Sequence, residues 1–181
     1  MTFHIPSTTS FEEAAIVPLT AMMATVLLCS VLGMLQPWNK LAEKTLLAIY
    51  GAASAVGVYA VQLATRSGIH SLMCVAGKGV EFVEGLIDRI AEDVVVDYRK
   101  PSLVEDIRAA LPEGQKLMFA LDTVSGKGSY GNICKMLSTD GGKLTMVLPP
   151  DLGEEKIPEV IMAEQGQVGL AFNELKELGF A

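Results

Sequence analysis

The feature that most constrains this chain is an apolar run that leads through a turn of small residues into an amphipathic segment. The run spans Leu46–Tyr50, and the turn spans Gly51–Gly57. A strand of a parallel sheet is buried on both faces, so it reads as continuously apolar. After the turn, apolar residues recur at helical spacing as far as Gly68, which suits the position just beyond a helix end. The pattern predicts a buried strand, a tight turn and a helix between residues 46 and 68.

The turn only partly matches the glycine pattern G-x-G-x-x-G, in which backbone amides and a helix N-terminus bind a phosphate. Aligned on its last glycine, the three positions are Ala52, Ser54 and Gly57. Gly57 keeps the position that allows close helix–sheet packing, and the Ser54 hydroxyl can donate to a phosphate oxygen. Two interpretations stay open at this point: a phosphate-binding turn, or an ordinary strand–turn–helix unit with small residues for packing.

Composition narrows the function classes. With 181 residues, one domain is the simplest expectation, and 50% of the residues are hydrophobic. The net charge of −7 and the pI of about 4.8 argue against a nucleic-acid partner. The cysteines Cys29, Cys74 and Cys134 lie far apart, so neither a zinc site nor a disulfide framework is indicated. No basic segment precedes an apolar core at the N-terminus, and a reducing, cytoplasmic compartment is expected.

The N-terminal region raises the question of a membrane span, because residues 14–39 carry no charge. Ser10 and Glu13 have the spacing of a capping box, which predicts a helix start at Phe11. Pro18 cannot continue that helix but suits the first turn of a second one. We therefore expect two helices that pack at an interface, with a membrane span as the alternative.

The rest of the chain alternates strand and helix patterns, which predicts an α/β fold with a doubly wound parallel sheet. Ser102 is expected to cap its helix, with Glu105 at the third helical position. Residues 160–172 fit neither pattern, and residues 173–178 suit one or two helical turns. We divide the chain into a helical lead-in (1–40), a nucleotide-binding domain (41–150) and a poorly defined C-terminal segment (151–181). The expected strands are 70–75, 94–98, 116–122 and 143–148, and the expected helices are 80–87, 102–111 and 130–137.

The turn after the second strand indicates which nucleotide the domain prefers. NAD-binding domains place an acidic residue there to hold the ribose 2′-hydroxyl. This turn has no acid and offers Lys78 with the amides of Gly77 and Gly79, which suit a 2′-phosphate. The other interpretation of Lys78 is a solvated turn lysine.

Candidates for other chemistry are few. His4 and His70 are the only histidines, and neither neighbours a nucleophile. Asp122 ends a predicted strand and is expected to form a turn rather than to act as a general base. Tyr50 and Tyr130 lack the Tyr-x-x-x-Lys spacing of short-chain reductases. No metal-ligand pattern is present, and no catalytic residue is assigned.

The order of several motifs makes a family resemblance specific. Phe11–Ala15 with Pro18, Leu35–Trp38, Gly51–Gly57, Val61–Ala64 and Asp97–Arg99 follow one another along the chain. Together they resemble the nucleotide-binding domain of medium-chain dehydrogenases/reductases, in the quinone-oxidoreductase-like (zinc-type alcohol dehydrogenase-like) branch. Within that branch the chain is most similar to fungal trans-acting enoyl reductases of polyketide biosynthesis. The resemblance covers about residues 11 to 150.

The resemblance implies NADP(H) as cofactor and a set of residues around it. The family's Ser-Pro-x-Asn turn falls on Ala76–Gly79, where its serine is lost, and residues 88–93 form a longer connection than in the family. The implied cofactor residues are Gly51, Ala53, Ser54, Ala55, Val56 and Gly57 at the pyrophosphate, Ala76, Gly77, Lys78 and Gly79 at the 2′-phosphate, Tyr98 at the adenosine, and Val147 and Leu148 at the nicotinamide. The implied substrate-binding residues are Pro18, Leu19, Thr20, Ala21, Met22, Met23, Ala24 and Thr25.

The function that the resemblance implies is hydride transfer from NADPH to the alkene of a polyketide thioester in secondary metabolism. A polyketide synthase is the implied partner. The family also has an N-terminal GroES-like domain that carries catalytic groups and half of the cleft, whereas this sequence starts just before the nucleotide domain. The alternative is therefore a catalytically inactive, nucleotide-binding remnant of such a reductase.

Overall fold

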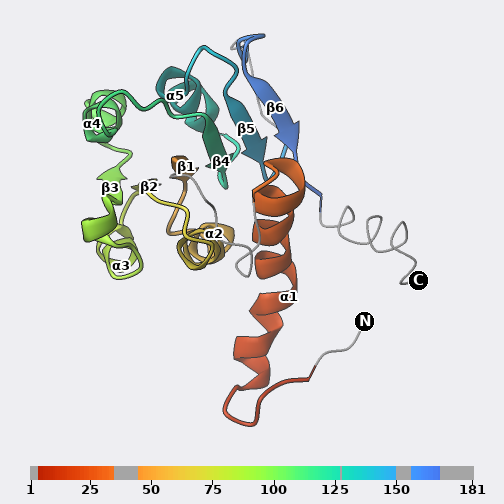
Figure 1. The fold of residues 1–181 in the computed structure, drawn as a ribbon. Helices are drawn as coiled ribbons and strands as arrows, with labels where there is room; N and C mark the ends of the chain where they lie inside the picture. The colour runs from red at the N-terminus through yellow and green to blue at the C-terminus, as the bar shows by residue number, and fades with distance from the viewer. Residues whose placement is uncertain (1–3, 35–44, 127, 150–155, 168–181) are drawn as a thin grey trace.

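The computed structural model describes residues 4–34, 45–126, 128–149 and 156–167. Its centre is a six-stranded sheet in the order β3-β2-β1-β4-β5-β6, in which every neighbouring pair is parallel. The expected α/β, doubly wound fold is confirmed, with β1 in the interior of the sheet (Figure 1). The strands are β1 Leu47–Tyr50, β2 Leu72–Ala76, β3 Val94–Asp97, β4 Phe119–Asp122, β5 Lys143–Met146 and β6 Met162–Gln165.

Helices cover both faces of the sheet (Figure 1). Side chains alternate between the faces along each strand, so Leu47 and Ile49 enter one apolar core with α2, while Ala48 and Tyr50 enter the other with α4 and α5. The helices are α1 Phe11–Thr25, α2 Ala55–Arg66, α3 Val80–Glu84, α4 Leu103–Ala110 and α5 Ser129–Met136, with a π-helical turn at Val26–Val31 and a 3₁₀ turn at Arg89–Ala91.

The N-terminal region forms one helix, so the expectation of two helices separated at Pro18 is wrong. The capping box is confirmed, with Ser10 and Glu13 bonded reciprocally at 2.8 and 3.2 Å, and α1 then continues through Pro18 to Thr25. Proline lacks the N–H that would donate to Ala14, which disfavours this position. Burial of Leu27 and Leu28 in the following turn, where the chain packs into the core, offsets that loss.

The two ends of this helix differ in burial. Ala24 and Leu27 are fully buried, whereas Phe11 is 81% and Leu19 65% exposed. Phe11–Val31 is long and apolar enough to cross a membrane, and 28% of its most apolar window is buried in the described structure. Core helices of soluble proteins meet the same criterion, and the buried end packs beside α2, as an interface helix would (Figure 1).

Several boundaries differ from those expected. Helix α3 ends at Glu84 rather than near residue 87, since Gly85 caps it. Ser102 precedes α4, but its side chain makes no capping hydrogen bond. The ambiguous stretch 160–172 contains β6. This strand is short and mostly exposed, and it lacks an apolar strand pattern. The predictions for residues 35–38 and 173–178 lie outside the described residues.

Replacing Pro18 with alanine should stabilise the protein. The new N–H can donate to the Ala14 carbonyl. The gain of roughly 3 kcal/mol for a helix interior is reduced by the freer unfolded chain, leaving about 2 kcal/mol. Urea unfolding of Pro18→Ala measures this gain. Pro101→Ala, outside any helix, is the control and should not gain stability. Unchanged or lower stability of Pro18→Ala would contradict our account of α1.

Candidate functional site

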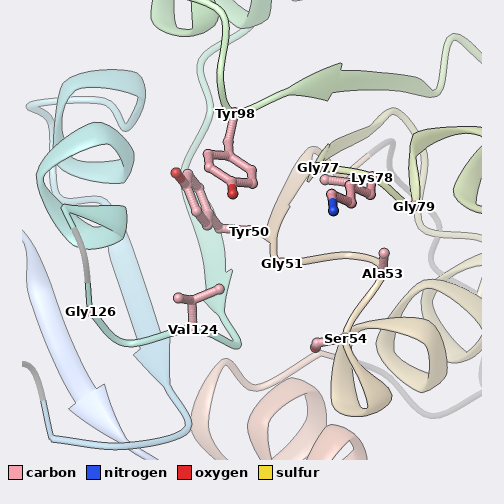
Figure 2. A pocket seen from close by; sticks show the side chains of 11 residues that line it. Tyr50, Gly51, Ala53, Ser54, Gly77, Lys78, Gly79, Tyr98, Val124 and Gly126 are labelled. Carbon is pink, nitrogen blue, oxygen red and sulfur yellow. The ribbon is translucent and has the colours of Figure 1, made fainter.

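A cavity of about 320 Å³ opens where the carboxyl ends of β1, β2, β3 and β4 meet. Ligands of doubly wound folds bind at this edge of the sheet. Figure 2 shows its walls, which come from segments far apart in the sequence. Eight of the residues that the sequence singled out line this cavity: Gly51, Ala53, Ser54, Ala76, Gly77, Lys78, Gly79 and Tyr98. Three further lining residues, Tyr50, Val124 and Gly126, were not among the sequence candidates.

The turn after β1 is tightly fixed to its neighbours. The amides of Gly51 and Ala52 both donate to the Val75 carbonyl at 2.9 Å, and the Ser54 amide donates to the Gly51 carbonyl at 2.8 Å. Gly57, in the first turn of α2, has no room for a side chain, because a Cβ would lie 2.2 Å from the Gly51 oxygen. The helix therefore begins directly against the turn, as the sequence pattern predicts.

Helix α2 presents its N-terminus at this turn. Ser54 is the N-cap, and its Oγ accepts from the Gly57 amide at 3.0 Å. The amides of Ala55 and Val56, in the same first turn, have no acceptor within the helix, because the first turn of any helix leaves such donors unpaired. Together with the positive end of the helix dipole, these donors suit a phosphate group.

The turn after β2 packs closely because it contains two glycines. A Cβ on Gly77 would lie 2.5 Å from the Tyr98 ring, and a Cβ on Gly79 would lie 2.5 Å from the Ala53 side chain. Lys78 between them is exposed, and its amine is directed into the space between Tyr98 and Ala53 (Figure 2). The turn thus brings a cation to the cavity beside an aromatic ring.

The pKa values of two side chains near the cavity are shifted by their surroundings. Burial raises the pKa of Tyr50, a hydrogen bond with Asn132 opposes that shift, and the nearby Asp122 charge adds to it. The Tyr50 phenol is therefore neutral near pH 7. Hydrogen bonds from Arg99 lower the pKa of Asp97, at the end of β3, to about 2. That carboxylate is paired with Arg99, with Nε–Oδ1 at 2.9 Å, so it is already occupied.

Asp122 forms a turn, as the sequence predicts. Its side chain is fully buried and accepts from the Val124 amide at 2.8 Å, the Ser125 amide at 3.0 Å and the Ser129 hydroxyl at 2.5 Å. Both carboxylate oxygens are used in these contacts, which hold the start of the loop that leads to α5. No group of three or more possible metal ligands occurs in the described part of the chain.

The remaining candidates lie away from the cavity lining. Ala55, Val56 and Gly57 form the first turn of α2 just behind it. Val147 and Leu148 follow β5, where the Leu148 amide donates to Ser125 Oγ at 3.1 Å and its side chain is 58% exposed. The predicted substrate residues 18–25 lie on α1, which packs against α2, and none of them lines this cavity.

Comparison with known proteins places the chain among reductases. No protein-family profile matches it. It is 41% identical to the trans-enoyl reductase fsr4 of Gibberella fujikuroi over 97% of this chain and 53% of that protein. It is 29% identical to the trans-enoyl reductase fsa3 of Fusarium sp. over 80% of this chain and 40% of that protein. The chain thus spans about half the length of these relatives, or less.

The fold has solved counterparts. The crystal structure of the CurK enoyl reductase matches 99% of this chain and 55% of that one, with a TM-score of 0.70 and 20% sequence identity. At that identity the match supports the architecture of the sheet and its helices.

Gly57→Ala should strongly destabilise the protein, because the new methyl group would meet the Gly51 oxygen and neither the strand end nor the helix start can move freely. We expect a loss of about 3 kcal/mol in the free energy of unfolding, measured by urea titration. Gly85→Ala is the control: its Cβ would meet nothing nearer than 3.4 Å and its φ is −73°, so little change is expected. Equal stability of the two variants would show that the close approach is not required.

Proposed function

We propose that this chain, which belongs to the medium-chain dehydrogenase/reductase superfamily and is similar to fungal trans-enoyl reductases, binds the NADPH of an enoyl reduction. One observation carries the proposal. The helix start after β1, the lysine turn after β2 and the tyrosine after β3 line one cavity at the carboxyl edge of the sheet. Ligand cavities of doubly wound folds lie at this edge.

The residues present fit each charged part of the cofactor. The tight turn Gly51–Ser54 and the first-turn amides of α2 suit the pyrophosphate. Lys78 suits the 2′-phosphate, and Asp97, the acid that ends the neighbouring strand β3, is paired with Arg99. The exposed ring of Tyr98 offers a stacking surface for the adenine. When bound, NADPH supplies the hydride, and the chain orients it.

The proposed substrate is the alkene of a polyketide thioester, and the proposed partner is a polyketide synthase. Both proposals rest on the similarity to proteins named trans-enoyl reductases. Residues 18–25 and 147–148 are proposed as one wall of the substrate cleft. The second wall would come from residues beyond these 181, because the relatives are longer.

A binding role without catalysis is the second candidate, and the states of the ionisable groups favour it. In the described residues, Tyr50 is neutral and Asp122 uses both oxygens in its turn. Asp122 cannot act as an acid or base on a substrate without breaking the contacts that hold it. The chain alone would then hold the nucleotide without turning over.

We also propose that the protein works in the cytoplasm, with the exposed end of α1 covered by protein rather than by lipid. The buried end of the same helix already packs in the core, which a membrane-spanning segment would have to leave. Resistance of the expressed protein to carbonate extraction from membranes would contradict this proposal.

Lys78→Glu should reverse the choice of cofactor. The wild type should bind NADPH more tightly than NADH. Loss of one charge-assisted contact should weaken NADPH binding by about 1.5–3 kcal/mol, or roughly ten- to a hundredfold in affinity. Calorimetric titration of both cofactors measures this. Lys156→Glu makes the same charge change outside the cavity lining and should leave both affinities unchanged. Equal affinity of the wild type for NADPH and NADH would refute the proposed role of Lys78.

Binding and catalysis should separate in the 181-residue chain. Hydride transfer needs the nicotinamide and the alkene held in near-attack geometry with water excluded, and this chain supplies one wall of such a cleft. In the presence of a crotonyl thioester, we expect the chain to bind NADPH without oxidising it. The absorbance of the reduced nicotinamide measures the oxidation. Fusion of a GroES-like domain from a relative ahead of Met1 should restore some activity. Oxidation by the unfused chain would show that it contains a complete active site.

A further inference from the structure

Thr123, the first residue after β4, contacts the turn Gly51–Ser54 (the phosphate turn of the proposed site) without lining the cavity. Its amide donates to the Tyr50 carbonyl at 3.0 Å, which extends the pairing of β1 with β4. Its hydroxyl oxygen lies 2.9 Å from the carbonyl oxygen of Tyr50, 3.0 Å from the carbonyl oxygen of Gly51 and 2.8 Å from Ser54 Oγ. One side chain thus joins the end of β1, the turn and the cap of α2.

The hydrogen count sets the direction of these bonds. The hydroxyl of Thr123 has one hydrogen, and the Tyr50 and Gly51 carbonyls can only accept it. When that hydrogen goes to a carbonyl, the contact with Ser54 runs the other way, with the Ser54 hydroxyl donating to Thr123 Oγ1. Since Ser54 Oγ also accepts from the Gly57 amide at 3.0 Å, its hydrogen and one lone pair are both used.

The geometry around Gly51 depends on the same hydroxyl. Gly51 has a φ of +79°, and a Cβ there would lie 2.4 Å from Thr123 Oγ1 and 2.8 Å from a Val124 methyl group. The space that a side chain would take is therefore occupied by Thr123. Thr123, just after β4, can occupy this position because Gly51 has no side chain.

We propose that Thr123 is a positioning residue for the pyrophosphate: its hydroxyl holds the turn and the Ser54 cap so that the first-turn amides of α2 face the phosphates. This inference rests on the proposed NADPH site and deepens it. It also changes the role of Ser54, whose hydroxyl caps the helix and donates to Thr123 instead of donating to a phosphate oxygen. The amides and Lys78 then remain as phosphate donors.

The proposal separates two parts of the nucleotide site. Binding of the pyrophosphate depends on the turn that Thr123 holds, whereas binding of the 2′-phosphate depends on Lys78 and the turn after β2. Adenosine 2′-monophosphate has no 5′-phosphates, so it reports on the second part alone. If Thr123 had only a structural role, replacing it would weaken the binding of both ligands together.

The test compares the wild type with Thr123→Val, Thr123→Ser, Ser54→Ala and the Ser54→Ala/Thr123→Val double variant. Affinities for NADPH and adenosine 2′-monophosphate are measured by calorimetry and by amide chemical shifts in NMR spectra. We expect Thr123→Val to weaken the affinity for NADPH about tenfold or more. The affinity of Thr123→Ser should stay within about threefold of the wild-type value. The affinity for adenosine 2′-monophosphate should stay within about twofold of the wild-type value in all variants. The double variant should bind NADPH no more weakly than the weaker of the two single variants.

Three results would overturn the proposal. Unchanged NADPH affinity in Thr123→Val would show that the hydroxyl does not position the turn. Equal loss of affinity for both ligands would show a structural role only, and additive losses in the double variant would show that Ser54 acts independently of Thr123. Failure of the wild type to bind either ligand would instead refute the proposed function, and with it any role of Thr123 in binding.

Discussion

The structure depends on the close approach of α2 to the end of β1. Gly57 lets the helix begin against the Gly51 carbonyl, and that contact sets where the helix N-terminus points. The same contact requires a tight turn, which the paired amides of Gly51 and Ala52 hold against β2. With the turn fixed from β2 on one side and from Thr123, just after β4, on the other, the start of α2 is directed at the carboxyl edge of the sheet. A phosphate site needs this kind of rigid support, because amide donors act through their fixed direction.

The two apolar cores explain why this edge stays open. Leu47 and Ile49 pack under α2, while Ala48 and Tyr50 pack on the opposite face, so β1 is buried along its whole length. The cores reach Tyr50 and Ala76, the last residues of β1 and β2, and the cavity opens beside these strand ends. Small residues such as Gly77 and Gly79 keep the turns close together without filling the space between them. The packing that stabilises the sheet therefore also gathers the cavity lining.

The sequence predicts this region well because its constraints are local. The strand–turn–helix unit is indicated within one short stretch by a continuous apolar strand, a turn of small residues and Gly57. The turn that contains Lys78 lies at the end of the next strand. Prediction fails where the deciding contacts are distant. Pro18 stays inside α1 because the next turns are buried, and β6 forms on β5 with little apolar character of its own. The roles of Tyr50 and Thr123 depend on the register between β1 and β4, which no local pattern contains.

The central claim is that NADPH binds at the carboxyl edge of β1, β2 and β3, and amide chemical shifts measured during an NADPH titration test it most directly. Our account predicts saturable shifts that are largest from Gly51 to Val56 and at Gly77, Lys78 and Tyr98. The amides along the exposed end of α1 and on β6 should change little. Absence of shifts at the phosphate turn, or larger shifts on α1 than at Lys78, would contradict the account.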